Sequence, residues 1–222
     1  MLFLKNFSVS AQSMPIVHDI SLVLQSGQLV IITGDNGSGK STFASALMGL
    51  SGYSVSGQML LDGNDIANWV IEKRAHAGIF LGFQHPLEVP GLQIKTFLQH
   101  AYRSCKGADL SLDLLDQKIE KAFELVGLPV EYSKRNVHEG FSGGQKKRLE
   151  LVQMLVLEPR IVILDEPDSG LDALGVSALI RVINTYRIMH ENALVIIITH
   201  NTQLAKLLQA DRIYTMSAGR LV

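Results

Sequence analysis

Three short stretches of the chain are almost continuously apolar. They are QLVIIT at 28–33, RIVILDE at 160–166 and ALVIIITH at 193–200. Apolar runs of this length are typical of strands that are covered on both faces, as in a parallel sheet packed between helices. The pattern therefore predicts an α/β core in which these three stretches are central strands.

The N-terminal segment has a different pattern, in which apolar and polar positions alternate. LFLKNFSVS at 2–10 and IVHDISLVL at 16–24 both show it. Alternation of this kind is typical of antiparallel strands with one solvated face. We therefore expect a small antiparallel β layer before the core.

Apolar residues at helical spacing follow the first central strand, in FASALMGL at 43–50, which contains no helix breaker until Gly49. Helical spacing dominates again between about residues 84 and 158, in IKTFLQHAYRSC at 94–105 and in SLDLLDQKIEKAFELVGLP at 111–129. Ser111 is a plausible N-cap, and a third helix should begin near Ser142. We expect one domain over 1–222, with a core lobe from 1–83 and 159–222 and a helical subdomain at 84–158.

The composition is that of a folded chain without a general affinity for polyanions. Of the 222 residues, 47% are hydrophobic and 18% are charged, and 20 Lys and Arg stand against 21 Asp and Glu. This balance argues against disorder and against nucleic-acid binding. Cys105 is the single cysteine, so the chain alone builds neither a disulfide framework nor a cysteine-ligated metal site.

Neither a membrane span nor a signal peptide is expected. The apolar runs are strand-sized, well short of the roughly 18–20 residues that cross a bilayer. The N-terminal MLFLKNFSVS has no long apolar core followed by small residues. We therefore expect a cytoplasmic chain with no direct membrane insertion, and we interpret its positive mean hydropathy, +0.21, partly as a helical surface that a partner covers.

A phosphate-binding motif directly follows the first central strand. It matches G-x-x-x-x-G-K-[ST] and consists of Gly34, Asp35, Asn36, Gly37, Ser38, Gly39, Lys40, Ser41 and Thr42. A glycine-rich turn at a helix N-terminus can point several backbone N–H groups at one phosphate, and the helix dipole favours the negative charge. Lys40 is expected to reach the β- and γ-phosphates of ATP, and the Ser41 hydroxyl to ligate Mg²⁺.

Two carboxylates end the second central strand. Asp165 and Glu166 follow a buried run at the carboxyl end of the strand, where open α/β sheets bind ligands. We expect Asp165 to hold Mg²⁺ through water, and Glu166 to orient or deprotonate the water that attacks the γ-phosphate.

A second helix N-terminus carries Ser142, Gly143, Gly144 and Gln145, followed by Lys146, Lys147 and Arg148. A Ser and two Gly before an apolar-periodic stretch predict exposed N–H groups and a second anion site. Cations in a first helical turn oppose the helix dipole, which suggests an anionic ligand or partner nearby.

Taken together, these motifs resemble those of the ATP-binding-cassette (ABC) ATPases. GDNGSGKST, Gln84 in GFQHP, FSGGQ, IVILDEP, SGLD at 169–172 and His200 occur in that family's order. The resemblance implies a P-loop NTPase fold with a RecA-like α/β core, an N-terminal antiparallel β layer and an inserted α-helical subdomain. It also implies a head-to-tail homodimer closed by ATP, in which Ser142, Gly143 and Gly144 of one copy contact the γ-phosphate bound to the other.

The same resemblance implies roles for three further residues. Gln84 would sense the metal and the attacking water, Asp172 would make a contact across the dimer, and His200 would hold the γ-phosphate and the water. The family usually stacks an aromatic residue on adenine, and Ala11 is at the corresponding position here.

Within that family, several stretches resemble the Suf-type iron–sulfur assembly ATPases, the SufC group. They are GIFLGFQHPLEVPGL at 78–92, GFSGGQKKRLELVQMLVLEP at 140–159 and LDEPDSGLD with its Asp168. Gln145 departs from the Glu that is commoner in this group, and SGLDALG is shorter than its usual SGLDIDAL. The resemblance implies partners similar to the SufB and SufD scaffold proteins, docked on the helical subdomain.

Three other functions remain open from the residues. A nucleotide-binding subunit of a membrane transporter would use the same chemistry but dock on a transmembrane partner. Lys134, Arg135, Lys146, Lys147 and Arg148 suggest a nucleic-acid-associated ATPase, although the long heptad runs typical of that class are missing from the sequence. A small-molecule kinase also has a P-loop, but it would not need FSGGQ or SGLD.

Overall fold

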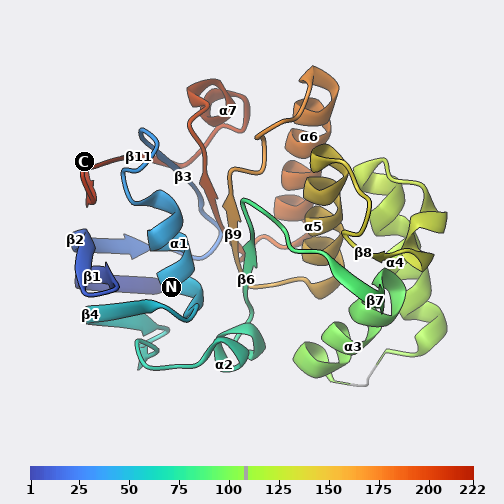
Figure 1. The fold of residues 1–222 in the computed structure, drawn as a ribbon, viewed down its shortest axis with the longest axis horizontal. Coiled ribbons are helices and arrows are strands. Elements are labelled where there is room, and N and C mark those ends of the chain that lie inside the picture. Colours follow the sequence, from blue (N-terminus) through green and yellow to red (C-terminus); the bar gives the residue numbers. More distant parts are fainter. Residues whose placement is uncertain (108–109) are drawn as a thin grey trace.

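A 6-stranded sheet in the order β12-β11-β3-β10-β9-β6 forms the centre of the computed structural model, which describes residues 1–107 and 110–222 (Figure 1). Five of its strands are parallel: β3 (Leu29–Thr33), β6 (Ile79–Gly82), β9 (Ile161–Asp165), β10 (Leu194–Ile198) and β11 (Arg212–Ser217). The short β12 (Arg220–Leu221) is antiparallel to β11. The three predicted central strands are confirmed as β3, β10 and β9, and they are neighbours.

Side chains of each central strand are divided between two cores. In β3, Leu29 and Ile31 belong to the core that includes the helices after residue 93, whereas Val30 and Ile32 belong to the core beneath the N-terminal layer. All four are fully buried. Burial of each such side chain contributes about 1.5–3 kcal/mol, which explains why these runs contain almost no polar residue.

The N-terminal layer is an antiparallel sheet in the order β2-β1-β4-β5. Its strands are β1 (Leu2–Ala11), β2 (Met14–Leu24), β4 (Tyr53–Leu61) and β5 (Asn64–Asp65), and helix α1 (Lys40–Met48) lies between this sheet and the central one (Figure 1). The two predicted strands are confirmed, but the sequence analysis missed β4 and β5. Most of β4 is exposed or half-buried, so YSVSGQ lacks the apolar signal of a strand.

Helices α3 (Ile94–Lys106), α4 (Leu112–Val126) and α5 (Gly143–Leu157) lie on the other side of the sheet, with α6 (Ala173–Met189) (Figure 1). The predicted start of α4 is confirmed, because the Ser111 Oγ accepts a hydrogen bond from the Leu114 N–H at 3.4 Å. A 3₁₀ helix (Val130–Lys134) and a two-stranded sheet of β7 (Val89–Gln93) and β8 (Asn136–Val137) interrupt this helical segment, which the sequence analysis did not predict.

Two short helices, α2 (Ile71–His76) and α7 (Thr202–Leu207), complete the described part of the chain. Within residues 1–107 and 110–222, every helix is too short or too polar to span a bilayer.

Arg74 of α2 is buried and joins α2 to the end of α1. Its Nη1 donates to the carbonyls of Ala46 and Leu47 at 2.9 and 2.8 Å. Its Nε and Nη2 donate to the carbonyls of Trp69 and Ala67 at 2.9 and 2.8 Å. A single guanidinium therefore satisfies four backbone carbonyls, two of them at the C-terminus of the helix that follows the phosphate-binding motif.

Arg74→Met is expected to lower the free energy of unfolding by about 3–5 kcal/mol, because each carbonyl left without a donor costs about 1–3 kcal/mol. The Ala46 carbonyl keeps the Gly49 N–H at 3.1 Å, so the loss falls on the other three. Urea denaturation of both proteins measures the difference. The matched control is Lys73→Met, since Lys73 is exposed and lies over the Trp69 ring at 4.1 Å. An Arg74→Met protein within 1 kcal/mol of wild type would contradict the assignment.

Candidate active site

The polar residues singled out by the sequence lie at one edge of the central sheet. Gly34 follows β3, Glu166 follows β9, and Gln84 and His200 come two residues after β6 and β10. These four strands are consecutive in the order β3-β10-β9-β6 and run parallel. Their carboxyl ends therefore meet, and this is the edge where open α/β sheets bind ligands.

The turn between β3 and α1 requires its glycines. Gly34 has φ +143, and a Cβ there would lie 2.1 Å from the Met216 carbonyl oxygen of β11. Gly39 has φ +105 and precedes α1, whose N-terminus has no side-chain cap and no acidic residue in its first turn. The first N–H groups of α1 thus remain available, and with the helix dipole they favour an anion.

Lys40 points back over this turn. Its side chain is buried, and its Nζ donates to the carbonyls of Gly34 and Asp35, both at 2.8 Å. The ammonium is therefore held above the N–H groups of the turn. Cation and N–H groups together form a cradle for phosphate oxygens.

A pocket of about 340 Å³ contains this turn and the ends of two other strands. It is lined by Ile16, Asn36, Gly37, Gly39, Lys40, Ser41, Thr42, Gln84 and Glu166. Ile16, on β2, was missed by the sequence analysis, which considered Ala11 instead. Ala11 pairs with Met14 at the β1–β2 turn. The contact of Ile16 depends on how the N-terminal layer packs over the turn, so local sequence gives no signal for it.

The acidic end of β9 fits a divalent cation. Asp165 is buried, and its Oδ1 has no hydrogen-bond partner within the described chain. Burial raises the pKa of this carboxyl, and a hydrogen bond to Ser41 lowers it in part. A buried oxygen without a partner, beside a serine hydroxyl, is the hard donor set that Mg²⁺ prefers, and such an ion would offset the cost of burying the charge.

Glu166 has a backbone conformation that L-residues rarely adopt. Its φ is +48, and its N–H donates to the Ile198 carbonyl of β10 at 2.8 Å. Gln84 Nε2 donates to Glu166 Oε2 at 2.8 Å, and His200 Nδ1 lies 3.9 Å from Oε1. Backbone strain of this kind is concentrated at functional sites, where the fold holds a side chain in a particular direction. The Glu166 carboxylate therefore lies between the Gln84 amide and the His200 imidazole, at the rim of the pocket.

The turn that carries His200 is held by hydrogen bonds of the preceding residue, Thr199. The Thr199 hydroxyl donates to both carboxylate oxygens of Asp168, at 2.9 and 3.0 Å, and accepts from the Asn201 N–H at 2.9 Å. Asp168 and Thr199 are buried. This contact connects the ends of β9 and β10.

The predicted second anion site lies apart from this pocket. Ser142, Gly143, Gly144 and Gln145 begin α5, and Asp172 caps α6 by accepting from the Gly175 N–H at 2.7 Å. None of the five lines the pocket around Lys40. Gln145 and Ser142 form a capping box, in which Gln145 Oε1 accepts from the Ser142 N–H at 2.9 Å.

The basic residues after Gln145 have partners within the chain. Lys147 is buried, Lys146 pairs with Glu88 at 2.7 Å, and the Arg148 guanidinium donates to the Gly127 carbonyl at 3.4 Å. Arg135 lies over the Tyr132 and Phe141 rings. These contacts within the chain account for Lys146, Lys147, Arg148 and Arg135 without an external anion.

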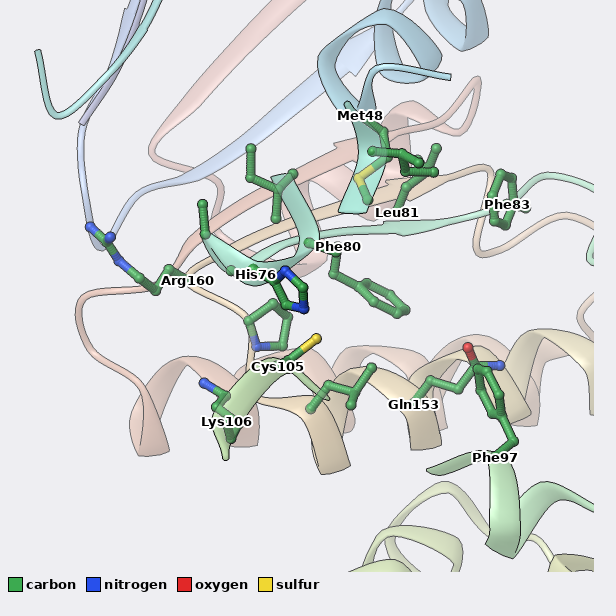
Figure 2. A pocket seen from close by; sticks show the side chains of 17 residues that line it. Met48, His76, Phe80, Leu81, Phe83, Phe97, Cys105, Lys106, Gln153 and Arg160 are labelled. Carbon is green, nitrogen blue, oxygen red and sulfur yellow. The ribbon is translucent and has the colours of Figure 1, made fainter. Parts of the chain in front are cut away.

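A second cavity, of about 400 Å³, lies between β6, α2, α3 and α5. Figure 2 shows Phe80 of β6 and Cys105 of α3 pointing toward each other across it, with His76, Phe97 and Gln153 at its walls. Phe83, which precedes Gln84, also lines it. The cavity thus adjoins the segment that leads from β6 into the active-site pocket.

Comparison with known proteins agrees with this geometry. A family model described as "ABC transporter" matches residues 17–169. A probable ATP-dependent transporter, ycf16, of Trieres chinensis is 39% identical over 99% of this chain and 88% of its own. A probable ABC transporter ATP-binding protein of Streptococcus pyogenes is 37% identical over 99% of this chain and 86% of its own.

Among solved structures, the dimeric ATP-binding cassette MJ0796, in a post-hydrolysis state with ADP and Pi, has a TM-score of 0.87 and 20% identity. The match covers 100% of this chain and 96% of that one. At this identity the likeness supports the fold alone.

Proposed function

Because the chain belongs to the ABC transporter family and is an ATPase that uses ATP with Mg²⁺, we propose that it drives iron–sulfur cluster assembly of the Suf type. In this proposal, ATP closes two copies of the chain head to tail and the closure reshapes a scaffold complex. The observation that carries the ATPase chemistry is the convergence of Lys40, Glu166, Gln84 and His200 at the ends of four adjacent strands.

The polar residues in and beside the pocket have distinct roles in this chemistry. Lys40 and the N–H groups from Gly34 to Thr42 bind the phosphates, and Ser41, Gln84 and Asp165 hold Mg²⁺, directly or through water. Bound Mg²⁺ neutralises charge on the β- and γ-phosphates. Glu166 orients or deprotonates the attacking water, and His200 contacts the γ-phosphate.

The separation of Ser142–Gln145 from the pocket of the same chain supports a head-to-tail dimer. These residues begin a helix whose N–H groups can bind an anion, yet the phosphate cradle of their own chain lies elsewhere. A second copy would bring its own Ser142–Gln145 segment, the signature motif, to this chain's pocket, with Asp172 in contact across the interface. Each site is then complete only when two chains meet.

The Suf-type proposal is supported by the sequence resemblance, and part of the resembling stretch lies in the wall of the second cavity. Its wall contains Gly78, Ile79, Phe80, Leu81 and Phe83, which belong to the stretch that resembles the Suf-type ATPases. Partners similar to SufB and SufD would dock on this side of the helical subdomain, next to the segment that leads to Gln84. The described residues contain no group of three or more His, Cys, Asp and Glu that could hold a metal.

The second candidate is the nucleotide-binding subunit of a membrane transporter. The names of the relatives from Trieres chinensis and Streptococcus pyogenes favour it, because both refer to transporters. The two candidates differ only in what docks on the helical subdomain.

Purification of the tagged chain from its native cells, without detergent and with it, separates the two candidates. Co-purification of soluble scaffold proteins is expected, and ATP hydrolysis should rise when they are added back. Recovery of an integral membrane protein in stoichiometric amount would overturn the Suf-type proposal and support the transporter.

A matched pair of surface variants locates the docking surface. Leu87→Asp changes a side chain that is 82% exposed in the loop after Gln84, and it should abolish co-purification of the partner. Leu207→Asp, at a 58% exposed position of α7, should leave it intact. Loss of the partner from the Leu207 variant alone would contradict docking beside Gln84.

A further inference from the structure

Two side chains of α5 hold the peptide groups on either side of Phe83. Glu150 Oε1 accepts the Phe83 N–H at 2.8 Å, and Lys147 Nζ donates to the Phe83 carbonyl at 2.7 Å. Phe83 lies between the end of β6 and Gln84. Both hydrogen-bonding groups of the residue before Gln84 are therefore bound by the helix that begins with Ser142–Gln145.

The same ammonium also reaches the end of β9. Lys147 Nζ donates to the Asp165 carbonyl at 3.2 Å, directly before Glu166. Lys147 thus bridges the carbonyls that precede Gln84 and Glu166, and the side chains of these two residues meet at 2.8 Å. Lys147 therefore lies where it can fix the relative position of the two backbone segments that carry this pair.

The packing around this bridge leaves little freedom. Lys147 and Glu150 are both buried, and they are three residues apart on one face of α5. Burial raises the pKa of Glu150 to about 8 and lowers the pKa of Lys147. Gly82 permits the approach, because a Cβ there would lie 2.9 Å from Leu164 Cδ2 and 3.5 Å from Glu150 Oε2.

We propose that Lys147 and Glu150 are positioning residues for ATP hydrolysis, which set the spacing of Gln84 and Glu166 and couple it to the helix of the signature motif. The proposal rests on the proposed ATPase roles of Gln84 and Glu166. Neither residue needs to touch the nucleotide, since both act on backbone groups. A movement of α5 would be transmitted to the attacking-water site through hydrogen bonds of 2.7–3.2 Å.

The test uses the double variant Lys147→Met/Glu150→Met in the full chain. Removing both charges together leaves neither member of the pair as an unpaired buried ion. The Phe83 N–H and the carbonyls of Phe83 and Asp165 lose their partners, so the melting temperature is expected to fall by several degrees while the protein stays folded at the assay temperature.

The affinity for a non-hydrolysable ATP analogue should stay within about threefold of wild type. The single-turnover rate of hydrolysis should fall at least tenfold. The control is Lys118→Met on α4, which removes the ion pair between Lys118 and Glu158 and should leave the rate unchanged.

A double-mutant cycle with Gln84→Ala separates positioning from general stability. If the pair acts through Gln84, the double variant should slow the Gln84→Ala protein by less than about threefold, far less than it slows wild type. Equal slowing of wild type and of the Gln84→Ala protein, an unchanged rate in the folded double variant, or a double variant that is unfolded at the assay temperature would each overturn the proposal. Failure of wild type itself to hydrolyse ATP would instead refute the proposed function.

Discussion

A Glu166→Gln variant is expected to bind ATP as tightly as wild type and to hydrolyse it about 10²- to 10⁴-fold more slowly. The amide has nearly the shape of the carboxylate, so it can keep the strained backbone at φ +48 and the contact with Gln84. It cannot accept a proton from water. The phosphate cradle around Lys40 is untouched, which is why binding and turnover should separate.

Single-turnover hydrolysis and equilibrium binding of ATP, measured on the same preparation, test this separation. Sedimentation should also show more dimer in the variant than in wild type when ATP and Mg²⁺ are present, because the closed state is no longer resolved by hydrolysis. Glu191→Gln changes an exposed glutamate in the turn before β10 and is the matched control. Turnover by the Glu166 variant at the wild-type rate would remove Glu166 from the reaction.

A Lys40→Ala variant is expected to lose at least about 100-fold in affinity for ATP. Its ammonium is the cation held over the phosphate-binding turn, by two carbonyls at 2.8 Å. Charge-assisted hydrogen bonds contribute about 1.5–3 kcal/mol each, and a loss of about 2.7 kcal/mol corresponds to 100-fold. The loss should appear in binding itself, unlike the effect of Glu166→Gln.

Isothermal titration with ATP and Mg²⁺ measures the affinity. Lys40→Met keeps the apolar stem and should lose as much as the alanine variant, which assigns the effect to the charge rather than to packing. Lys5→Ala, at an exposed position of β1, should bind like wild type. An alanine variant that binds ATP within fivefold of wild type would refute the phosphate role of Lys40.

The central strands and the helices after residue 93 could be predicted because their signals are local. A strand such as β3 is buried on both faces, so its residues are apolar at every position, and Ser111 and Gly127 mark the ends of α4 directly. In contrast, β4 lies in the N-terminal layer with few buried side chains, and its sequence carries little hydrophobic pattern.

The residues proposed for the site could be picked out from the sequence for the same reason. Gly34–Thr42, Asp165 and Glu166 are recognisable because a phosphate or a metal ion requires those residue types at that spacing, directly after a strand. Ile16 and the contacts of Lys147 gave no such signal. Lys147, read as a charge in a first helical turn, suggested an external anion, whereas α5 packs so closely on β6 and β9 that its ammonium binds their last carbonyls instead.

The sequence by itself determined the central strands, several helices and the residue types at the strand ends, since these depend on residues close together along the chain. Tertiary structure alone decided which ends are neighbours. The order β3-β10-β9-β6 brings Gln84 within 2.8 Å of Glu166, although 82 residues separate them. That order results from packing between distant segments, and it also places Lys147 and Glu150 beneath the pair that they are proposed to position.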